Sequence, residues 1–205
     1  MTRKSRRALP LSPDERRRSI ITAVTPLLIE HGAPVTTRQM AEAAGIAEGT
    51  IFGVFPDKRA LILEAVKFSM DPAPTQRALA EIYPSAPLEV KMAEAGRILM
   101  DRSDRVIALV SILRTLPPPA EHDHSHSSLD FVEKANATIN ESLTEMFATH
   151  SESLSMEPGR AAAAFRSMVL SNSHPALSGH ERLTVQEIVA VLTRGILEPE
   201  KVTVP

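Results

Sequence analysis

Residues 36–55 read TTRQMAEAAGIAEGTIFGVF. Thr36 and Gln39 have the spacing of a capping box, which predicts that a short helix begins after Thr36. Gly45 can adopt a positive φ at the turn that follows, and a second short helix is expected before Pro56 ends it. Two short helices joined at a glycine predict a helix-turn-helix.

The flanking residues predict a longer helix on each side of this motif. The stretch 12–15, SPDE, is another capping box with a proline in the first turn. It predicts a helix over 13–31, which Gly32 ends. Asp57 is positioned to cap a further helix over 57–68.

The rest of the chain has helical periodicity, and no stretch shows the alternation of a sheet. Further helices are expected near 75–82, 87–102, 104–116, 128–150, 158–173 and 184–197. The expected fold class is therefore all-α, with an amino-terminal three-helix helix-turn-helix domain followed by a larger helical domain.

The composition excludes several classes of protein. The chain has 205 residues, no cysteine and 3% aromatic residues, so disulfides, thiol catalysis and cysteine-ligated metals are excluded. Its apolar runs are far shorter than the roughly 20 residues of a membrane helix, and its first residues lack the apolar segment of a secretory signal. We therefore expect a cytoplasmic protein. The sequence contains no catalytic motif, so we expect that the protein is not an enzyme and has no cofactor.

Charge divides the chain into two unlike parts. Residues 1–67 contain 11 Lys and Arg against 7 Asp and Glu, whereas residues 68–205 contain 12 against 18. The formal charge of -2 is thus the sum of +4 and -6. Seven of the first eleven cations lie within residues 1–18. Such a basic arm binds phosphate or an acidic surface, or is only a solvated tail.

A set of residues between positions 20 and 63 carries a more specific signal. It consists of Ile21, Ala23, Gly32, Thr36, Thr37, Met40, Ala41, Ala44, Gly45, Ile46, Gly49, Thr50, Ile51, Phe52, Phe55, Pro56, Asp57, Lys58 and Leu61. With these residues, the segment 20–63 closely resembles the amino-terminal domain of the tetracycline-repressor-like (TetR) family of transcriptional regulators. The resemblance implies that the second short helix is a recognition helix, which enters the DNA major groove.

The resemblance also implies which residues contact DNA. The candidates are Thr36, Thr37, Arg38, Glu48, Gly49, Thr50, Phe52, Gly53 and Lys58. Free N–H groups at the start of the first short helix favour a phosphate, and Gly49 and Thr50 allow close approach to DNA. Lys58 resembles the family's lysine that reaches the DNA backbone. The alternative is that 36–55 is only a small packed helical unit.

Several of these positions differ from the family's usual pattern or leave alternatives open. Phe52 replaces the usual tyrosine and lacks its hydroxyl, and Gly53 lowers helix propensity by about 1 kcal/mol relative to alanine. Ala47 replaces a frequent capping serine. These changes predict weaker binding, an unusual operator or reliance on the basic arm. Glu48 either accepts from cytosine N4 or is a solvated first-turn carboxylate.

The expected domains are a basic arm (1–11), the helix-turn-helix domain (12–55), a connecting helix (56–70) and a helical domain (71–205), which the resemblance implies is an effector-binding and dimerisation domain. Adaptable or aromatic side chains are the ligand-binding candidates: Met92, Met100, Phe131, Met146 and Phe147. The resemblance also implies that the last two long helices form the dimer interface, and their small and apolar side chains are the candidates: Ala161, Phe165, Met168, Val169, Ile188, Val189 and Leu192. Intramolecular core is the alternative for both sets.

Three histidines, His122, His124 and His126, alternate with other residues after a run of prolines. Such a tract binds zinc, nickel or copper where a scaffold fixes its geometry. Because no scaffold is evident here, we interpret it as a solvated loop and expect no metal site.

Together these features predict a ligand-responsive transcriptional regulator, specifically a repressor. We expect it to bind a palindromic double-stranded DNA operator as a homodimer, to be released by an unknown small-molecule effector, and not to use a membrane. The alternative is a helical ligand- or metal-binding protein with a degenerate DNA-binding head, suggested by Phe52, Gly53 and the histidine tract. A scaffold that binds neither DNA nor ligand is the third possibility.

Overall fold

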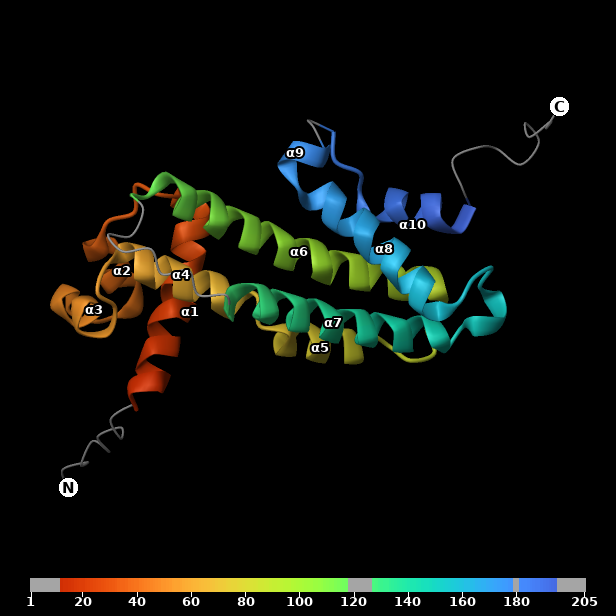
Figure 1. Cartoon of the computed structure of the whole chain (residues 1–205), viewed down its shortest axis with the longest axis horizontal. Helices are drawn as coiled ribbons and strands as arrows, with labels where there is room; N and C mark the ends of the chain where they lie inside the picture. Colours follow the sequence, from red (N-terminus) through yellow and green to blue (C-terminus); the bar gives the residue numbers. More distant parts are fainter. Residues whose placement is uncertain (1–11, 118–126, 179–180, 195–205) are drawn as a thin grey trace, which may run out of the picture. The chain divides into compact units, whose positions relative to one another are not determined.

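The computed structural model describes residues 12–117, 127–178 and 181–194, and only the backbone of residues 127–131 and 175–176. Within these ranges every regular element is a helix, and the fold is all-α (Figure 1). The elements are α1 (Pro13–His31), α2 (Thr37–Ala44), α3 (Glu48–Val54), α4 (Lys58–Ser69), α5 (Pro72–Ala80), α6 (Leu88–Thr115), α7 (Ser127–Ala148), the 3₁₀ helix η1 (Ser151–Ser153), α8 (Pro158–Ser173), α9 (Pro175–Ser178) and α10 (Val185–Arg194). None of the helices in the described ranges is both long and apolar enough to cross a membrane.

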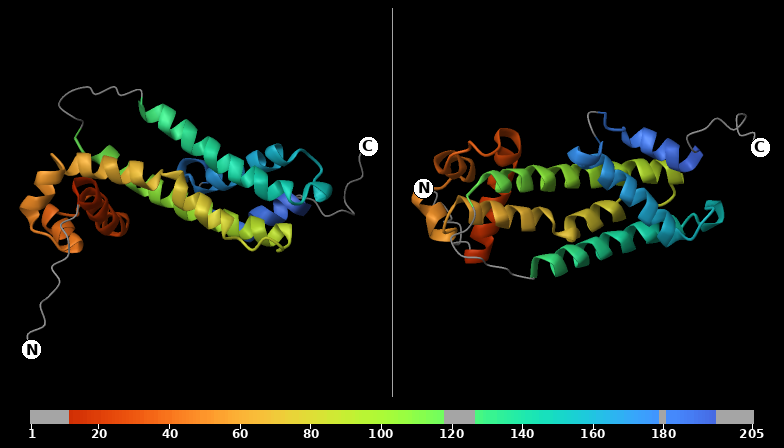
Figure 2. Two further views of the ribbon diagram at one scale, coloured as in Figure 1. Left: turned by 90° about the horizontal axis from the view of Figure 1, so that it is seen from below. Right: turned by 45° about the horizontal axis from the view of Figure 1, so that its top comes forward.

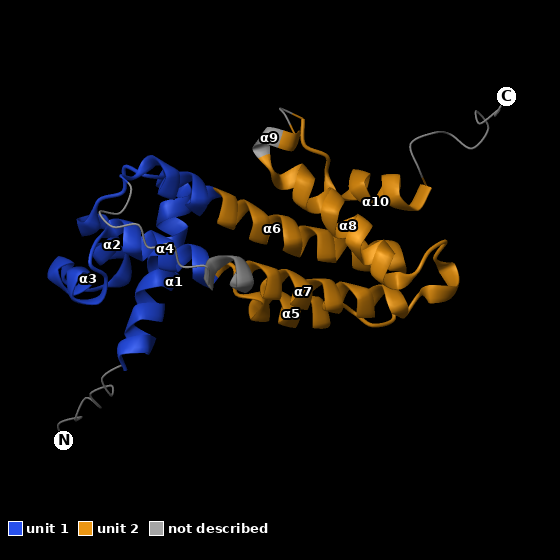
Figure 3. Ribbon diagram, in the orientation of Figure 1, with its two compact units in different colours: residues 1–68, 108–118 blue, residues 69–107, 119–205 orange. Residues whose placement is uncertain are grey.

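The chain forms two compact units (Figure 3). We call residues 1–68 with 108–118 the head, and residues 69–107 with 119–205 the body. Helix α6 contributes residues to both units. The inclusion of 108–118 in the head is a long-range feature, and local periodicity gives no sign of it.

Local sequence signals explain most of the helix ends. Helices α1 and α8 have the predicted bounds, and Asp71 starts α5 earlier than expected because its Oδ1 accepts from the Ala73 N–H at 3.0 Å. The predicted helix over 184–197 is α10, and residues 195–197 lie outside the described ranges.

One prediction was wrong: the two helices expected over 87–102 and 104–116 are a single helix, α6. The junction residues contain no glycine or proline, so nothing there breaks the backbone hydrogen bonds. Asp104 is also held from outside the helix, because Arg182 Nη1 donates to its Oδ1 at 2.9 Å. The predicted boundary near residue 103 therefore lies inside a continuous helix.

The head is built on a small aliphatic core. Helix α1 packs against α2 and α3. The largest fully buried side chains of the head are Ile20, Leu28, Met40, Ile51, Phe55, Leu61, Ile62 and Leu109. Both predicted capping boxes form: Ser12 with Glu15 at the start of α1, and Thr36 with Gln39 at the start of α2. The head therefore combines short, individually capped helices with a shared core.

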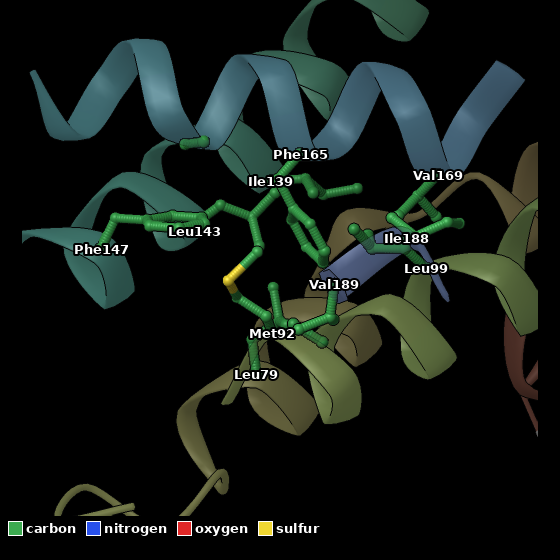
Figure 4. Close-up of a cluster of buried hydrophobic side chains, with 12 residues drawn as sticks. Leu79, Met92, Leu99, Ile139, Leu143, Phe147, Phe165, Val169, Ile188 and Val189 are labelled. Carbon is green, nitrogen blue, oxygen red and sulfur yellow. The ribbon is translucent and has the colours of Figure 1, made fainter. Parts of the chain in front are cut away.

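The body has a larger core made by long helices. Helix α7 lies alongside α5 and α8, as both views in Figure 2 show. Side chains from five helices point toward one another (Figure 4); the buried ones are Leu79, Met92, Ala95, Leu99, Ile139, Leu143, Phe147, Ala162, Phe165, Val169, Ile188 and Val189. Gly96 is required by this packing, because a Cβ there would lie 2.8 Å from Val185 Cγ1.

Candidate nucleic-acid interface

The turn between α2 and α3 depends on one glycine. Gly45 has φ 66° and ψ 31°, the left-handed conformation in which glycine avoids a Cβ penalty. Its N–H donates to the Ala41 carbonyl, and the Ile46 N–H donates to the same oxygen at 3.0 Å. These bonds end α2 and reverse the chain, so that α3 begins three residues later. The helix-turn-helix predicted from the sequence is thus confirmed.

Helix α3 has one buried and one exposed face. Ile51 and Phe55, at its inner face and carboxyl end, are each 1% exposed and fix the helix to the head's core. Glu48, Gly49, Phe52 and Gly53 are exposed, Thr50 is half-buried, and the Phe52 side chain is 52% exposed. Burial on one side of α3 therefore leaves its other side exposed. Ala47 precedes the helix without a side-chain cap.

The first residues of α2 and α3 are joined by a hydrogen bond. Thr37 Oγ1 donates to Glu48 Oε1 at 2.7 Å. Thr36 caps α2 by accepting from the Gln39 N–H at 3.2 Å, and the Thr36 N–H donates to Gln39 Oε1 at 2.8 Å. The candidates Thr36, Thr37 and Glu48 thus lie together, and the Glu48 carboxylate has a partner within the head.

Arg38 is the most accessible of the predicted phosphate-binding residues. Its Nε lies 3.1 Å from Glu42 Oε1, and its side chain is 79% exposed. Exposed ion pairs of this kind contribute at most about 1 kcal/mol. Arg38 can therefore exchange Glu42 for a phosphate at little cost.

The half-buried Lys58 side chain is bonded to the backbone of the head. Its Nζ donates to the Ala33 and Val35 carbonyls in the connection between α1 and α2. Burial lowers the pKa of the Lys58 ammonium group. An ammonium group has three donors, so one remains for an external phosphate. The expected role at the DNA backbone is thus joined by a structural one, which the sequence did not indicate.

Arg17 was not predicted as an individual site residue, because it was counted only among the seven cations of residues 1–18. Arg17 Nη2 donates to the Val54 carbonyl at the end of α3 at 3.3 Å, and its guanidinium carbon lies 5.2 Å from the centre of the Phe55 ring. A cation is favourable at a helix carboxyl terminus and over an aromatic face. Arg17 precedes Ile21, Val24 and Leu28 at helical spacing, which was the available signal.

The body contains a pocket of about 560 Å³. Of the ligand-binding candidates, Met92 and Phe147 line it, and Phe165, Leu154, Met156 and Leu192 lie beside them. Met100 and Met146 instead pack against the core, partly buried. The side chain of Phe131 lies outside the described residues.

The predicted dimer-interface side chains are mostly core within one chain. Phe165, Val169 and Ile188 are completely buried and Val189 is 7% exposed, while Ala161, Met168 and Leu192 pack partly buried against the same core. Because buried side chains present no surface, any contact between copies at α8 and α10 must use their other faces.

Some predictions lie beyond the described ranges. The basic arm (1–11) and His122, His124 and His126 are among them. Within the described residues, no group of three or more His, Asp and Glu side chains could hold a metal ion.

Comparison with known proteins identifies the class of this fold. Residues 20–65 match the model of the bacterial regulatory proteins of the tetR family. No curated protein matches the chain. A TetR/AcrR-family regulator from Thermobifida fusca is similar in structure, with a TM-score of 0.59 and 18% identity over 89% of this chain and 99% of that one.

Two further similar structures were solved with small molecules. A transcriptional regulator from Saccharomonospora viridis in complex with choline has a TM-score of 0.59 and 18% identity, over 87% of this chain and 94% of that one. A TetR-like regulator from Mycobacterium smegmatis in complex with proflavine has a TM-score of 0.54 and 19% identity, over 91% of this chain and 99% of that one.

The helix-turn-helix thus lies in a segment that matches a family of bacterial regulatory proteins, and the all-α fold is the one seen in solved regulators. The match to the tetR family model is confined to this amino-terminal segment, and over most of its length the chain shares its fold with the solved TetR-like structures.

Proposed function

We propose that this protein is a ligand-responsive transcriptional repressor, which binds a palindromic DNA operator as a homodimer. The observation that carries the proposal is the division of α3: Ile51 and Phe55 are buried, and the opposite face is exposed with no contact from the described residues around its glycines. A short helix fixed in this way can enter the major groove, while Arg38 and the first turn of α2 contact phosphates.

A homodimer is proposed because a palindromic operator has two equivalent half-sites. Successive major-groove faces are about 34 Å apart, so two heads related by a two-fold axis read two half-sites. On α8, the exposed residues Ala163, Ser167 and Ser171 recur at every fourth position. Small side chains at this spacing allow two helices to approach closely. We place the contact between copies on this face, opposite the buried Phe165 and Val169.

The pocket in the body is the site proposed for the effector. Its volume of about 560 Å³ falls within the range of small-molecule sites. The regulators crystallised with choline and with proflavine support the idea that this fold accepts small molecules. To release DNA, an effector must bind one spacing of the two heads more tightly by a few kcal/mol than the other.

A titration of the full-length protein against DNA upstream of its own gene tests the proposal. We expect specific binding with a steep salt dependence, because phosphate contacts release counterions. Arg38→Ala should weaken binding to all sequences and reduce the salt slope by about one. Arg77→Ala is the matched control, because it removes an equal charge from an exposed position in the body.

Binding that is equal for upstream DNA and random duplex would overturn the proposal. The second candidate, a helical ligand-binding protein with a degenerate head, would then be favoured by the lack of donors at Phe52 and Gly53. A shift in unfolding temperature with a small-molecule library, without DNA binding, would support that candidate. No shift and no DNA binding would leave a scaffold role.

A further inference from the structure

Nothing within the head explains why residues 49 and 53 of α3 are glycines. Gly49 and Gly53 both have ordinary negative φ, and a Cβ added at either would meet no described atom within 4 Å. Gly45 and Gly96 differ, since one needs a positive φ and the other avoids a clash with Val185. A glycine inside a helix lowers the equilibrium constant for helix formation about fourfold to fivefold relative to alanine. Neither backbone conformation nor packing within the head requires the missing side chains.

The two glycines flank an exposed aromatic ring. Residues three and four apart share a helix face, so Gly49, Phe52 and Gly53 lie on the same side of α3. Ile51 and Phe55 occupy the buried side. The Phe52 ring is 52% exposed and therefore stands as an apolar projection between two positions that have no side chain.

This face offers very little hydrogen bonding. Gly49, Phe52 and Gly53 have no side-chain donor or acceptor. Glu48 can only accept when ionised, and its carboxylate already accepts from Thr37 at 2.7 Å. The half-buried Thr50 hydroxyl is the remaining polar group of α3. Bidentate donation to guanine or adenine, which arginine, asparagine and glutamine perform, is therefore absent from this helix.

We propose that Phe52 reads thymine, by apolar contact with the C5-methyl group in the major groove. Thymine is the only base that presents a methyl group there, and phenylalanine is one of the side chains that contacts it. Gly49 and Gly53 allow the backbone of α3 to approach the base edges, so that the ring reaches the methyl. This inference rests on the proposed function and adds the base that the operator must contain.

Deoxyuridine provides a direct test, because it differs from thymidine only in lacking the methyl group. The full-length protein is first used to select a preferred duplex from a random pool. Each thymine of that duplex is then replaced by deoxyuridine, one position at a time. At the thymine under Phe52 we expect binding to weaken about fourfold, the value of one buried methyl-sized group. Replacement in both half-sites should weaken binding about fifteen-fold.

Variants assign this effect to the ring. Phe52→Ala should bind the thymine and deoxyuridine duplexes with equal affinity, because the group that senses the methyl is gone. Leu63→Ala is the matched control: it removes another exposed apolar side chain of the head, from α4, and should keep the fourfold difference. Gly53→Ala should raise the unfolding temperature, because alanine favours the helix, and yet weaken binding to the selected duplex.

The outcomes separate the two proposals. If no preferred duplex can be selected, the proposed function fails, and the inference fails with it. If a duplex is selected but deoxyuridine has no effect at any position, only the thymine inference is overturned. The same holds if Phe52→Ala retains the fourfold sensitivity, or if Gly53→Ala binds the duplex as tightly as the natural chain.

Discussion

The head and the body are stabilised over different distances in the sequence. In the head, Thr36 and Gln39 cap α2 across three residues, and Gly45 ends it by a bond to Ala41. In the body, Phe147 and Phe165 meet edge to face with ring centres 5.9 Å apart, and Arg182 reaches Asp104 across 78 residues. Short-range bonds require particular residue types at fixed spacing, whereas an apolar core requires only shape and volume.

This difference explains why the head has a recognisable sequence and the body does not. A motif is visible when each position has its own local reason, as Thr36, Gly45 and Asp57 do. Core positions accept many combinations of aliphatic residues if the total volume is kept. The family model accordingly covers residues 20–65 and stops before the body begins.

The largest effect should come from breaking the core of the body. Phe165→Ala removes a completely buried ring that contacts Phe147, and we expect it to lower the free energy of unfolding by about 3–5 kcal/mol. Urea unfolding followed by circular dichroism measures this. Leu177→Ala, at an exposed position in the body, should change stability by less than about 0.5 kcal/mol. Equal effects of the two variants would contradict the packing described.

Lys58→Met tests whether the head also depends on a longer-range bond. The Ala33 and Val35 carbonyls would lose their donor, so we expect a loss of about 1–2 kcal/mol in unfolding free energy. Lys67→Met makes the same change at an exposed ion pair with Glu64 and should cost less than about 1 kcal/mol. A Lys58→Met chain that binds DNA weakly with unchanged stability would limit Lys58 to phosphate contact.

A matched pair of caps separates stability from DNA binding. Thr36→Ala and Thr184→Ala each remove a hydroxyl that accepts from an N–H at 3.2 Å, so each should cost about 1 kcal/mol of stability. Only Thr36 adjoins the candidate DNA-binding surface, so only Thr36→Ala should weaken DNA binding. Urea unfolding and a DNA titration on both variants measure the two effects. If the Thr36→Ala and Thr184→Ala variants bind DNA with equal affinity, the start of α2 is not part of the DNA-binding surface.

The smallest expected effect is a pH dependence shared by the two regions. Hydrogen bonds from the Ser12 and Thr184 backbones lower the pKa of Glu15 and Glu187, respectively. A lowered pKa in the folded state gives stability that is present above pH 4.5 and is lost as the pH falls through the folded-state value. The small stability difference between the natural chain and Glu15→Ala or Glu187→Ala should therefore shrink below pH 4.5, as urea unfolding can measure. A difference that does not shrink as the pH falls below 4.5 would contradict this.

Where a structural feature is local, the sequence was sufficient to predict it. The all-α class, the helix-turn-helix and the capping boxes of α1 and α2 depend on residues within a few positions of one another, and they are confirmed. The boundary predicted near residue 103 was wrong because no glycine or proline at the junction breaks the backbone hydrogen bonds of α6.

The candidate site shows the same limit. Exposure of Phe52 and burial of Ile51 follow from the spacing of apolar residues along α3. The bonds of Lys58 to two carbonyls and of Arg17 to Val54 join separate elements, and no pattern within either segment indicates a partner. The bond between Thr37 and Glu48 likewise required the geometry of the turn.

The composition of the head also affects the order in which the protein can be completed during synthesis. The head is translated first, yet it includes residues 108–118, with Leu109 completely buried. Arg59 also donates to the carbonyls of Leu113, Leu116 and Pro117. The nascent head must therefore wait for some forty residues of the body to emerge from the ribosome before its last buried residues arrive. The head is therefore completed only after synthesis of the body has begun.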